Sequence, residues 1–198
     1  MCVNIDTTWF GKLGVTPPAT LADLADPTYS GLFVTPGAST SSPGMAFFPA
    51  TIAEYGDEWP SYWEDLLAND TKVVDGWEDA YYGDFTGGGG KGVRPIVVSY
   101  DSSPAFTVAD GKSSTAALLD TCFRQSEYAG VLEGAANPAG AQAVIDWLLS
   151  DEVQCRVADR DVRLPRERRR RGAGRLGDVR RAADRAAVGP AGRHRRQP

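Results

Sequence analysis

Two hydroxyl-rich stretches could bind a polar ligand group, because each follows a short apolar run typical of a buried strand. TPGASTSSPG at 35–44 follows the run LFV, and SSPAF at 102–106 comes one residue after the run IVVSY. In open α/β sheets, ligands bind beyond the carboxyl ends of the strands. Ser41 and Ser42 also stand at the start of a predicted helix, where exposed N–H groups and the helix dipole attract anions. They are candidate ligand contacts; the alternative is that Ser42 only caps the helix.

Aromatic residues accompany these loops. The acidic segment VVDGWEDAYYGDF at 73–85 carries Trp77, Tyr81 and Tyr82, while Tyr100 and Phe106 flank the second hydroxyl-rich loop. A cation over the face of a tryptophan or tyrosine ring gains about 0.5–2 kcal/mol. Each ring could instead belong to the core. Together with the serines, however, they suggest a cation held between rings.

The common catalytic arrangements are not found in this sequence. The single histidine, His194, lies near the C-terminus, which excludes His-based catalysis in the rest of the chain. GGGGKG at 87–92 fails as a phosphate-binding loop, because that pattern needs Gly in place of Phe85 and Ser or Thr in place of Gly92. A carbohydrate-processing module would need paired carboxylates, for which Asp75 and Asp101 are the candidates. Nothing in the sequence sets these two opposite each other, so we predict no catalytic residue, no metal site, no cofactor and no enzyme activity.

Three cysteines, Cys2, Cys122 and Cys155, make an odd count without a short spacing. This pattern indicates neither a disulfide framework nor a zinc site. Cys122 lies among apolar neighbours, and we predict that it is a small buried hydrophobic residue rather than a reactive thiol.

The charge divides the chain into two unlike parts. Residues 1–154 carry a formal charge of −15 and all the aromatic residues, whereas residues 155–198 carry +10 from 15 arginines and 5 acids, which gives the net −5. We predict a globular body over 1–154 and a disordered Arg-rich tail over 155–198. The tail could bind nucleic acid through phosphate contacts. No stacking aromatics interleave its arginines and the acidic body competes for it, so no nucleic-acid partner is expected.

Strands and helices alternate along 1–154, which predicts an α/β layer structure. Strands are expected at 3–5, 32–34, 96–100 and 122–128, with a short helix near 21–24. A short or kinked helix is expected after Ser42, because Pro49 lies inside the pattern. Further helices are expected at 59–70, at 76–85 and from Asn137, which is a good N-cap followed by Pro138. No run of about 18 apolar residues predicts a membrane span, and no secretion signal is visible.

Four regions, taken together, resemble the thiamine-binding substrate-binding proteins of bacterial ABC importers. They are STSSPGMAF, VVDGWEDAYY, the pair VVSY (97–100) and SSPAF (102–106), and NPAGAQAVIDWLLSDEVQ. That family belongs to the two-lobed periplasmic-binding-protein superfamily. The resemblance covers residues 3 to about 154 and implies one lobe of a type 2 fold, incomplete, with an N-terminal lobe lacking. It also implies that thiamine or a thiamine phosphate lies in a cleft between two lobes that close about a hinge.

The resemblance assigns roles to individual residues. Ser41 and Ser42 match hydroxyls near the phosphate end of the ligand, Trp77 matches a tryptophan beside it, and Tyr100 matches a tyrosine at a strand end. Phe106 stands where enteric members carry a tyrosine, so the ring is kept and the hydroxyl is absent. The remaining aromatics of the acidic segment, Tyr81 and Tyr82, are expected to pack their helix onto the sheet.

The same resemblance implies a membrane permease as partner and a periplasmic or cell-surface location. The alternative is a solute-binding protein for another small ion, such as a polyamine or iron. After Gln154 the family pattern gives way to CRVADRDVRLPRERRRR, which we interpret as a shifted reading frame. With half a cleft, this chain is expected to bind its ligand weakly.

Overall fold

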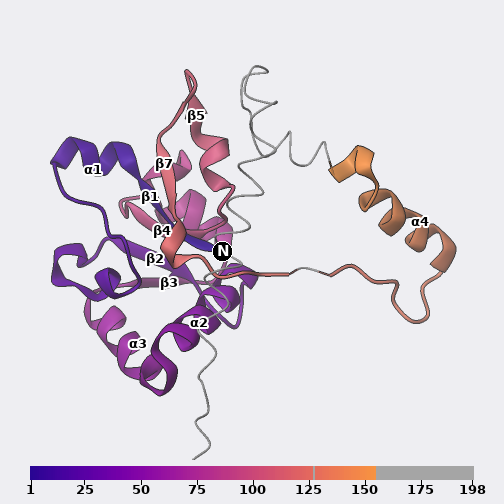
Figure 1. Ribbon diagram of the computed structural model, residues 1–198, viewed down its shortest axis with the longest axis horizontal. Helices are drawn as coiled ribbons and strands as arrows, with labels where there is room; N and C mark the ends of the chain where they lie inside the picture. Colours follow the sequence, from indigo (N-terminus) through magenta and orange to yellow (C-terminus); the bar gives the residue numbers. More distant parts are fainter. Residues whose placement is uncertain (127, 155–198) are drawn as a thin grey trace, which may run out of the picture.

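A five-stranded mixed sheet forms the centre of the computed structural model, which describes residues 1–126 and 128–154 (Figure 1). The strand order is β3-β2-β4-β1-β7. The strands are β1 (Cys2–Asp6), β2 (Phe33–Pro36), β3 (Lys72–Val74), β4 (Ile96–Ser99) and β7 (Thr115–Leu118), and a separate hairpin pairs β5 (Val108–Ala109) with β6 (Lys112–Ser113). The predicted strands at 3–5, 32–34 and 96–100 are confirmed within one or two residues.

Strand direction sets the geometry of the sheet. β2 is parallel to both β3 and β4, whereas β1 is antiparallel to both β4 and β7. The three parallel strands therefore end at one edge of the sheet, and β1 begins there, with Cys2 opposite Ser99. β2 and β4 are buried along their whole length. This burial explains why their sequences are nearly continuous apolar runs.

Helical segments other than α4 pack on both faces of the sheet in the described part of the chain. The α-helices are α1 (Thr7–Leu13), α2 (Ser42–Tyr55), α3 (Trp59–Ala68) and α4 (Pro138–Leu148). One π-helix spans Asp79–Asp84, and short 3-10 segments lie at Ala22–Ala25, Pro27–Tyr29, Gly56–Glu58, Thr86–Gly88, Ser103–Thr107 and Leu119–Thr121. The predicted α/β layer structure is confirmed.

Alternate residues of the strands enter two separate cores. Phe33 and Ile96 pack with Phe47 of α2 and with Leu66 of α3 on one face. On the other face, Val34 and Val97 contact Ala80, Tyr81 and Phe85 from the π-helical segment and its C-terminal flank. This alternation follows from the two-residue period of a strand.

α2 differs from its predicted form. It runs for 14 residues with Pro49 inside, so of the two predicted forms, short or kinked, the short one is excluded. Pro49 lacks the N–H that would bond the carbonyl of Met45, so α2 continues past this residue with one helix hydrogen bond fewer. The N-cap is Ser41 rather than Ser42, and its side chain makes no capping hydrogen bond.

The other helices agree with the sequence patterns in part. α3 buries Leu66 together with Tyr62, whose hydroxyl donates to the Leu21 carbonyl at 2.6 Å, while Leu67 is 55% exposed. The segment 76–85 forms a π-helix only from Asp79 onward. No strand is assigned at 122–126 or at Tyr128, which is almost fully exposed, so the predicted strand at 122–128 is wrong in its described part.

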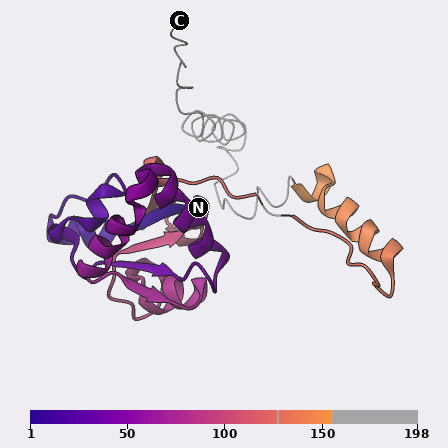
Figure 2. The ribbon, with the colours of Figure 1, turned by 90° about the horizontal axis from the view of Figure 1, so that it is seen from below.

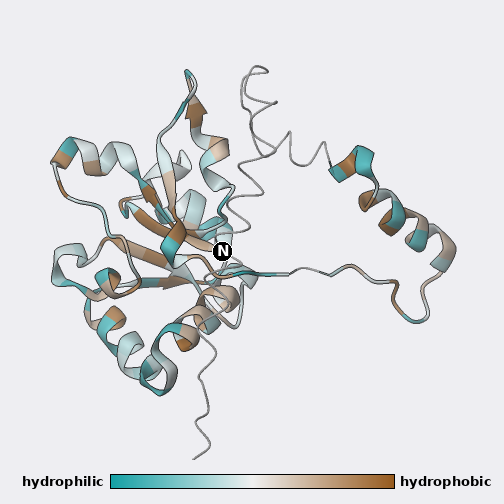
Figure 3. Ribbon diagram, viewed as in Figure 1, coloured by the Kyte–Doolittle hydropathy of each residue, from teal (hydrophilic) through white to brown (hydrophobic). Residues whose placement is uncertain are grey.

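α4 stands apart from the sheet in both ribbon views (Figure 1, Figure 2). Its predicted cap is confirmed, because the Asn137 side chain accepts a hydrogen bond from the Gly140 N–H at 2.9 Å. Val144, Trp147 and Leu148 are exposed, and Figure 3 shows apolar colour along this isolated helix. The predicted disordered tail over 155–198 lies outside the described residues. In the part that is described, no helix combines the length and apolar character that crossing a bilayer requires.

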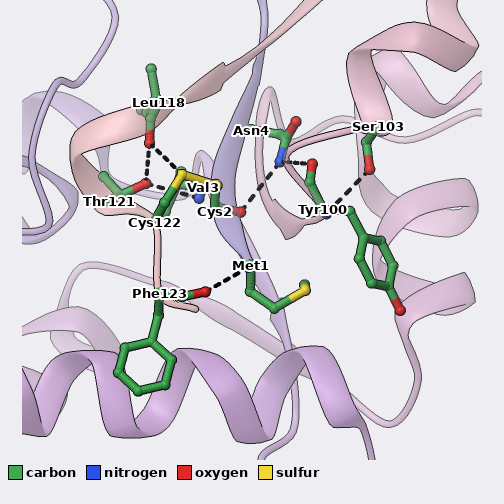
Figure 4. Close-up of a disulfide and its surroundings, with 10 residues drawn as sticks. All are labelled: Met1, Cys2, Val3, Asn4, Tyr100, Ser103, Leu118, Thr121, Cys122 and Phe123. Atoms are coloured by element: carbon green, nitrogen blue, oxygen red, sulfur yellow. Dashed lines mark hydrogen bonds between the residues drawn. A yellow bond between two sulfur atoms is a disulfide. The ribbon is translucent and has the colours of Figure 1, made fainter. Parts of the chain in front are cut away.

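A disulfide joins Cys2 and Cys122, which lie 120 residues apart in sequence (Figure 4). The prediction that Cys122 is a buried thiol outside any disulfide is therefore wrong. Antiparallel pairing of β1 with β7 sets Val3 opposite Leu118, which brings the residue before Val3 close to the chain that follows β7. Met1 and Phe123 exchange hydrogen bonds beside the disulfide, at 2.8 Å and 2.7 Å.

Replacing Cys2 and Cys122 together by Ser is expected to lower the free energy of unfolding by about 3–5 kcal/mol, since the disulfide closes a very long loop in the unfolded chain. Urea unfolding followed by circular dichroism measures this loss. Cys155→Ser, which leaves the disulfide in place, is the control. Wild-type stability in the double variant would contradict the expectation.

Candidate functional site

Three loops meet where the parallel strands end. Pro36 of β2 is paired with Val74 of β3, and the Gly37 N–H continues the contact by donating to the Val74 carbonyl at 2.7 Å. β4 lies on the other side of β2, with Val97 opposite Val34. The loop that carries the serines, the segment that carries Trp77 and the loop after Ser99 therefore emerge at the same edge.

Trp77 is half-buried at this edge and is not sunk in the interior. Its indole Nε1–H donates to the Ser99 hydroxyl at 2.9 Å. The indole stacks on Tyr81, with ring centroids 5.0 Å apart and planes inclined by 20°. Tyr82 and Tyr100 approach it edge-on, at 5.4 Å and 5.8 Å between centroids. Among the described residues, no ring stacks on the indole face opposite Tyr81.

Tyr81 and Tyr82 were both expected to pack their helix onto the sheet, but only Tyr81 does so. Tyr81 is buried and packs onto the sheet, as expected. Burial raises the pKa of its phenol, with a further contribution from Tyr82, so the hydroxyl remains protonated in neutral solution. Tyr82 is 53% exposed, so the expectation that it packs onto the sheet is wrong, and its ring lies at the rim of the cluster.

Tyr100 is held through its backbone. The fully buried Asn4 amide donates to the Tyr100 carbonyl at 3.1 Å, and the Tyr100 N–H donates to the Ser103 hydroxyl at 3.2 Å (Figure 4). Phe106 lies in the same loop region, on the 3-10 segment Ser103–Thr107, and is 69% exposed. The structure thus brings Trp77 and Tyr100 into contact and leaves Phe106 outside the ring contacts of Trp77 in the described chain.

A hollow of about 510 Å³ opens at the start of α2. Its polar wall consists of consecutive hydroxyl residues, and its lining as a whole is Ala38, Ser39, Thr40, Ser41, Ser42, Met45, Ala46, Pro49, Phe123 and Gln125. Ser41 is half-buried and Ser42 is exposed. The lining does not include Trp77, Tyr100 or Phe106. The serine hollow and the aromatic cluster are therefore two separate parts of the same sheet edge.

Gly44 allows the serine loop to fold against β2. A Cβ atom at this position would overlap the carbonyl oxygens of Pro36 and Gly37. Only glycine permits such a close approach of the first turn of α2 to the end of the strand. The position of the Ser41 and Ser42 hydroxyls thus depends on Gly44, which follows them by three and two residues.

Asp101 is not among the residues that line the hollow containing Asp75, the other carboxylate considered for carbohydrate chemistry. Asp101 is exposed after β4, while Asp75 lines a second hollow, of about 560 Å³, beside the edge strand β3. Lys72 and Asp84 form an ion pair of 2.7 Å in that same hollow. No cluster of potential metal ligands occurs among residues 1–126 and 128–154.

The fold places the chain in a class of known proteins. Its structure resembles a periplasmic thiamin-binding protein with a TM-score of 0.64 at 22% identity, covering 95% of this chain and 64% of that one. It also resembles the periplasmic binding protein P5PA, with a TM-score of 0.57 at 18% identity over 77% of this chain and 48% of the other. The architecture is therefore that of periplasmic binding proteins.

Sequence comparison gives the family. Residues 1–170 match the family described as bacterial extracellular solute-binding protein, and the chain belongs to it. This is a family of solute-binding proteins, in agreement with the prediction that the chain is not an enzyme.

Individual relatives are similar over most of this chain. The thiamine-binding periplasmic protein of Escherichia coli (strain K12) is 28% identical over 141 residues, and that of Salmonella typhimurium is 30% identical over 141 residues. Each alignment covers 70% of this chain and 42% of the relative. The protein of the same description from Brucella melitensis is 29% identical, over 64% of this chain and 36% of its own. The chain thus spans less than half the length of the curated relatives that it matches.

Sequence reasoning missed the buried residues that support the site. Ser99 accepts the hydrogen bond of the Trp77 indole, while Asn4 and Ser103 form hydrogen bonds with the Tyr100 backbone. Phe123 and Gln125 line the serine hollow. A polar residue inside an apolar strand is the one local signal that was available, because such a residue needs a buried partner. Asn4 and Ser99 both show it.

Gly44→Ala is expected to lower the free energy of unfolding by about 1–3 kcal/mol, because the added methyl group is forced against two backbone carbonyls. Gly11→Ala is the matched control: nothing lies within 4 Å of the place its added methyl group would take, and alanine favours the α1 helix. Urea unfolding of both variants tests the difference. Equal stability would show that the serine loop does not need the close approach at Gly44.

Proposed function

We propose that this chain is the ligand-binding part of an extracytoplasmic solute-binding protein that captures thiamine or a thiamine phosphate for an ABC importer. The observation that carries the proposal is the half-buried indole of Trp77, which has one face covered by Tyr81 and stands at the same sheet edge as the serine hollow. Relatives described as thiamine-binding periplasmic proteins support this choice of ligand.

The aromatic cluster suits the cationic ring of thiamine. A cation over an indole face gains about 0.5–2 kcal/mol, and the net charge of −15 on residues 1–154 attracts cations over a longer range. Because Tyr81 occupies one face of Trp77, the ligand ring stacks on the opposite face. Tyr82 and Tyr100, which are in T-shaped contact with the same indole, would contact the ligand ring at its sides, and the exposed Phe106 would add an apolar contact.

The serine hollow suits the alcohol or phosphate end of the same ligand. Ser41 and Ser42 lie at the first turn of α2, whose N–H groups and dipole favour a negative charge. Recognition of a ring at one end and an oxyanion at the other requires binding contacts and no chemical step.

In the full-length protein, a second lobe would close over the ligand, and a membrane permease would receive it. The curated relatives are more than twice as long as the matched region, and we propose that a further lobe, in the full-length protein, closes over the ligand. Residues 1–154 would form one lobe, with the Arg-rich segment 155–198 outside it. Delivery to a permease follows from this role. A periplasmic or cell-surface location is supported by the Cys2–Cys122 disulfide, since such bonds persist in oxidising compartments.

The full chain is expected to bind thiamine monophosphate with a Kd of roughly 10–100 µM, because one wall leaves part of the ligand in water. Trp77→Ala is expected to weaken this binding by about tenfold, in line with the loss of a cation–ring contact. Isothermal titration measures both values.

Trp147→Ala is the matched control, because Trp147 lies on α4, away from the site, and should leave the affinity unchanged. Spermidine and ferric citrate are titrated in parallel to test the alternative ligands. Tighter binding of either one than of thiamine monophosphate would refute the proposed ligand.

A further inference from the structure

Two buried hydroxyl groups lie directly behind the Trp77 indole. Ser99 is fully buried and Ser103 is 2% exposed. The Ser99 Oγ accepts the indole N–H at 2.9 Å and lies 2.7 Å from the Ser103 Oγ. The Ser103 Oγ in turn accepts the Tyr100 N–H at 3.2 Å. The side chain of one site aromatic and the backbone of the other are therefore tied to the same pair of hydroxyls.

Local chain structure alone does not fix the indole. Trp77 follows the three-residue edge strand β3, whose side chains are largely exposed, and precedes the π-helix at Asp79–Asp84. Ser99, in contrast, ends the buried strand β4, which is paired with β2 on one side and with β1 on the other. The hydrogen bond to Ser99 thus links the indole to a fully buried strand that has a partner on each side.

We infer that Ser99, supported by Ser103, is a positioning residue that sets the plane of the Trp77 indole. With this bond in place, one indole face stays against Tyr81 and the other faces the ligand position. Without it, the ring can turn about its side-chain torsions and lose the stacking geometry. The consequence for ligand affinity rests on the proposed function, whereas the orientation of the indole does not.

The molecule contains a matched indole–hydroxyl pair that serves packing alone. The Trp63 indole N–H donates to the fully buried Thr51 hydroxyl at 2.9 Å, between α2 and α3. Trp63 is packed on Phe47 and Phe48, and neither Thr51 nor Trp63 lines the serine hollow or contacts Trp77. Thr51→Val therefore removes the same kind of bond without touching the site.

The orientation is tested on the full chain by ¹H–¹⁵N spectra of the five tryptophan indoles, with the Trp77 and Trp63 signals assigned from Trp77→Phe and Trp63→Phe. Ser99→Ala is expected to shift the Trp77 N–H signal upfield and to speed its exchange with deuterium at least about tenfold, because the donor loses its buried acceptor. Thr51→Val should move the Trp63 signal and leave that of Trp77 in place. An unchanged Trp77 signal in folded Ser99→Ala would overturn the inference.

Titration with thiamine monophosphate tests the consequence for recognition. Ser99→Ala is expected to weaken binding about fivefold and Thr51→Val to leave it unchanged, with thermal unfolding showing that both variants fold. Ser103→Ala should give an intermediate loss, since it removes the support of Ser99 and keeps the acceptor. If the indole signal moves but affinity does not, Ser99 has no positioning role in recognition and the inference fails. If the wild type binds no thiamine monophosphate at all, the proposed function fails, and the indole spectra alone decide the orientation.

Discussion

Parallel pairing of β2 with both β3 and β4 is the constraint on which the rest of the structure depends. Three strands that run in one direction must end at one edge, and their following loops must share that edge. The serine loop, the Trp77 segment and the Tyr100 loop are spread along residues 37–103, and this pairing alone brings them together. Burial of β2 and β4 on both faces fixes the register, because a slip by one residue would exchange the two cores.

Much of the fold could be predicted from local patterns. The β-branched apolar run IVVS favours a buried strand, and Asn137 followed by Pro138 is typical of a helix start. The failures have a common cause, which is information from distant parts of the chain. Residues 122–126, for example, have strand-like composition, but no strand of the described chain pairs with them.

The ring residues of the site could be predicted from the sequence, but the polar residues that support them could not. Trp77 and Tyr100 stand out by type and by position after predicted strands, and the structure brings their rings within 5.8 Å. Ser99, Ser103 and Asn4 have no comparably direct signal, because their function depends on which atoms lie behind them in space. The Cys2–Cys122 bond was missed for the same reason: a separation of 120 residues becomes a contact only through the pairing of β1 with β7.

The central place of β1 in the sheet affects the order in which the sheet can form. β1 precedes every other described strand, yet both of its partners, β4 and β7, come much later in the chain, at Ile96–Ser99 and Thr115–Leu118. The sheet cannot close around β1 until Leu118 is available, and contacts of such long sequence separation form slowly. The Cys2–Cys122 bond then holds β1 beside the chain that follows β7 and secures the closed sheet.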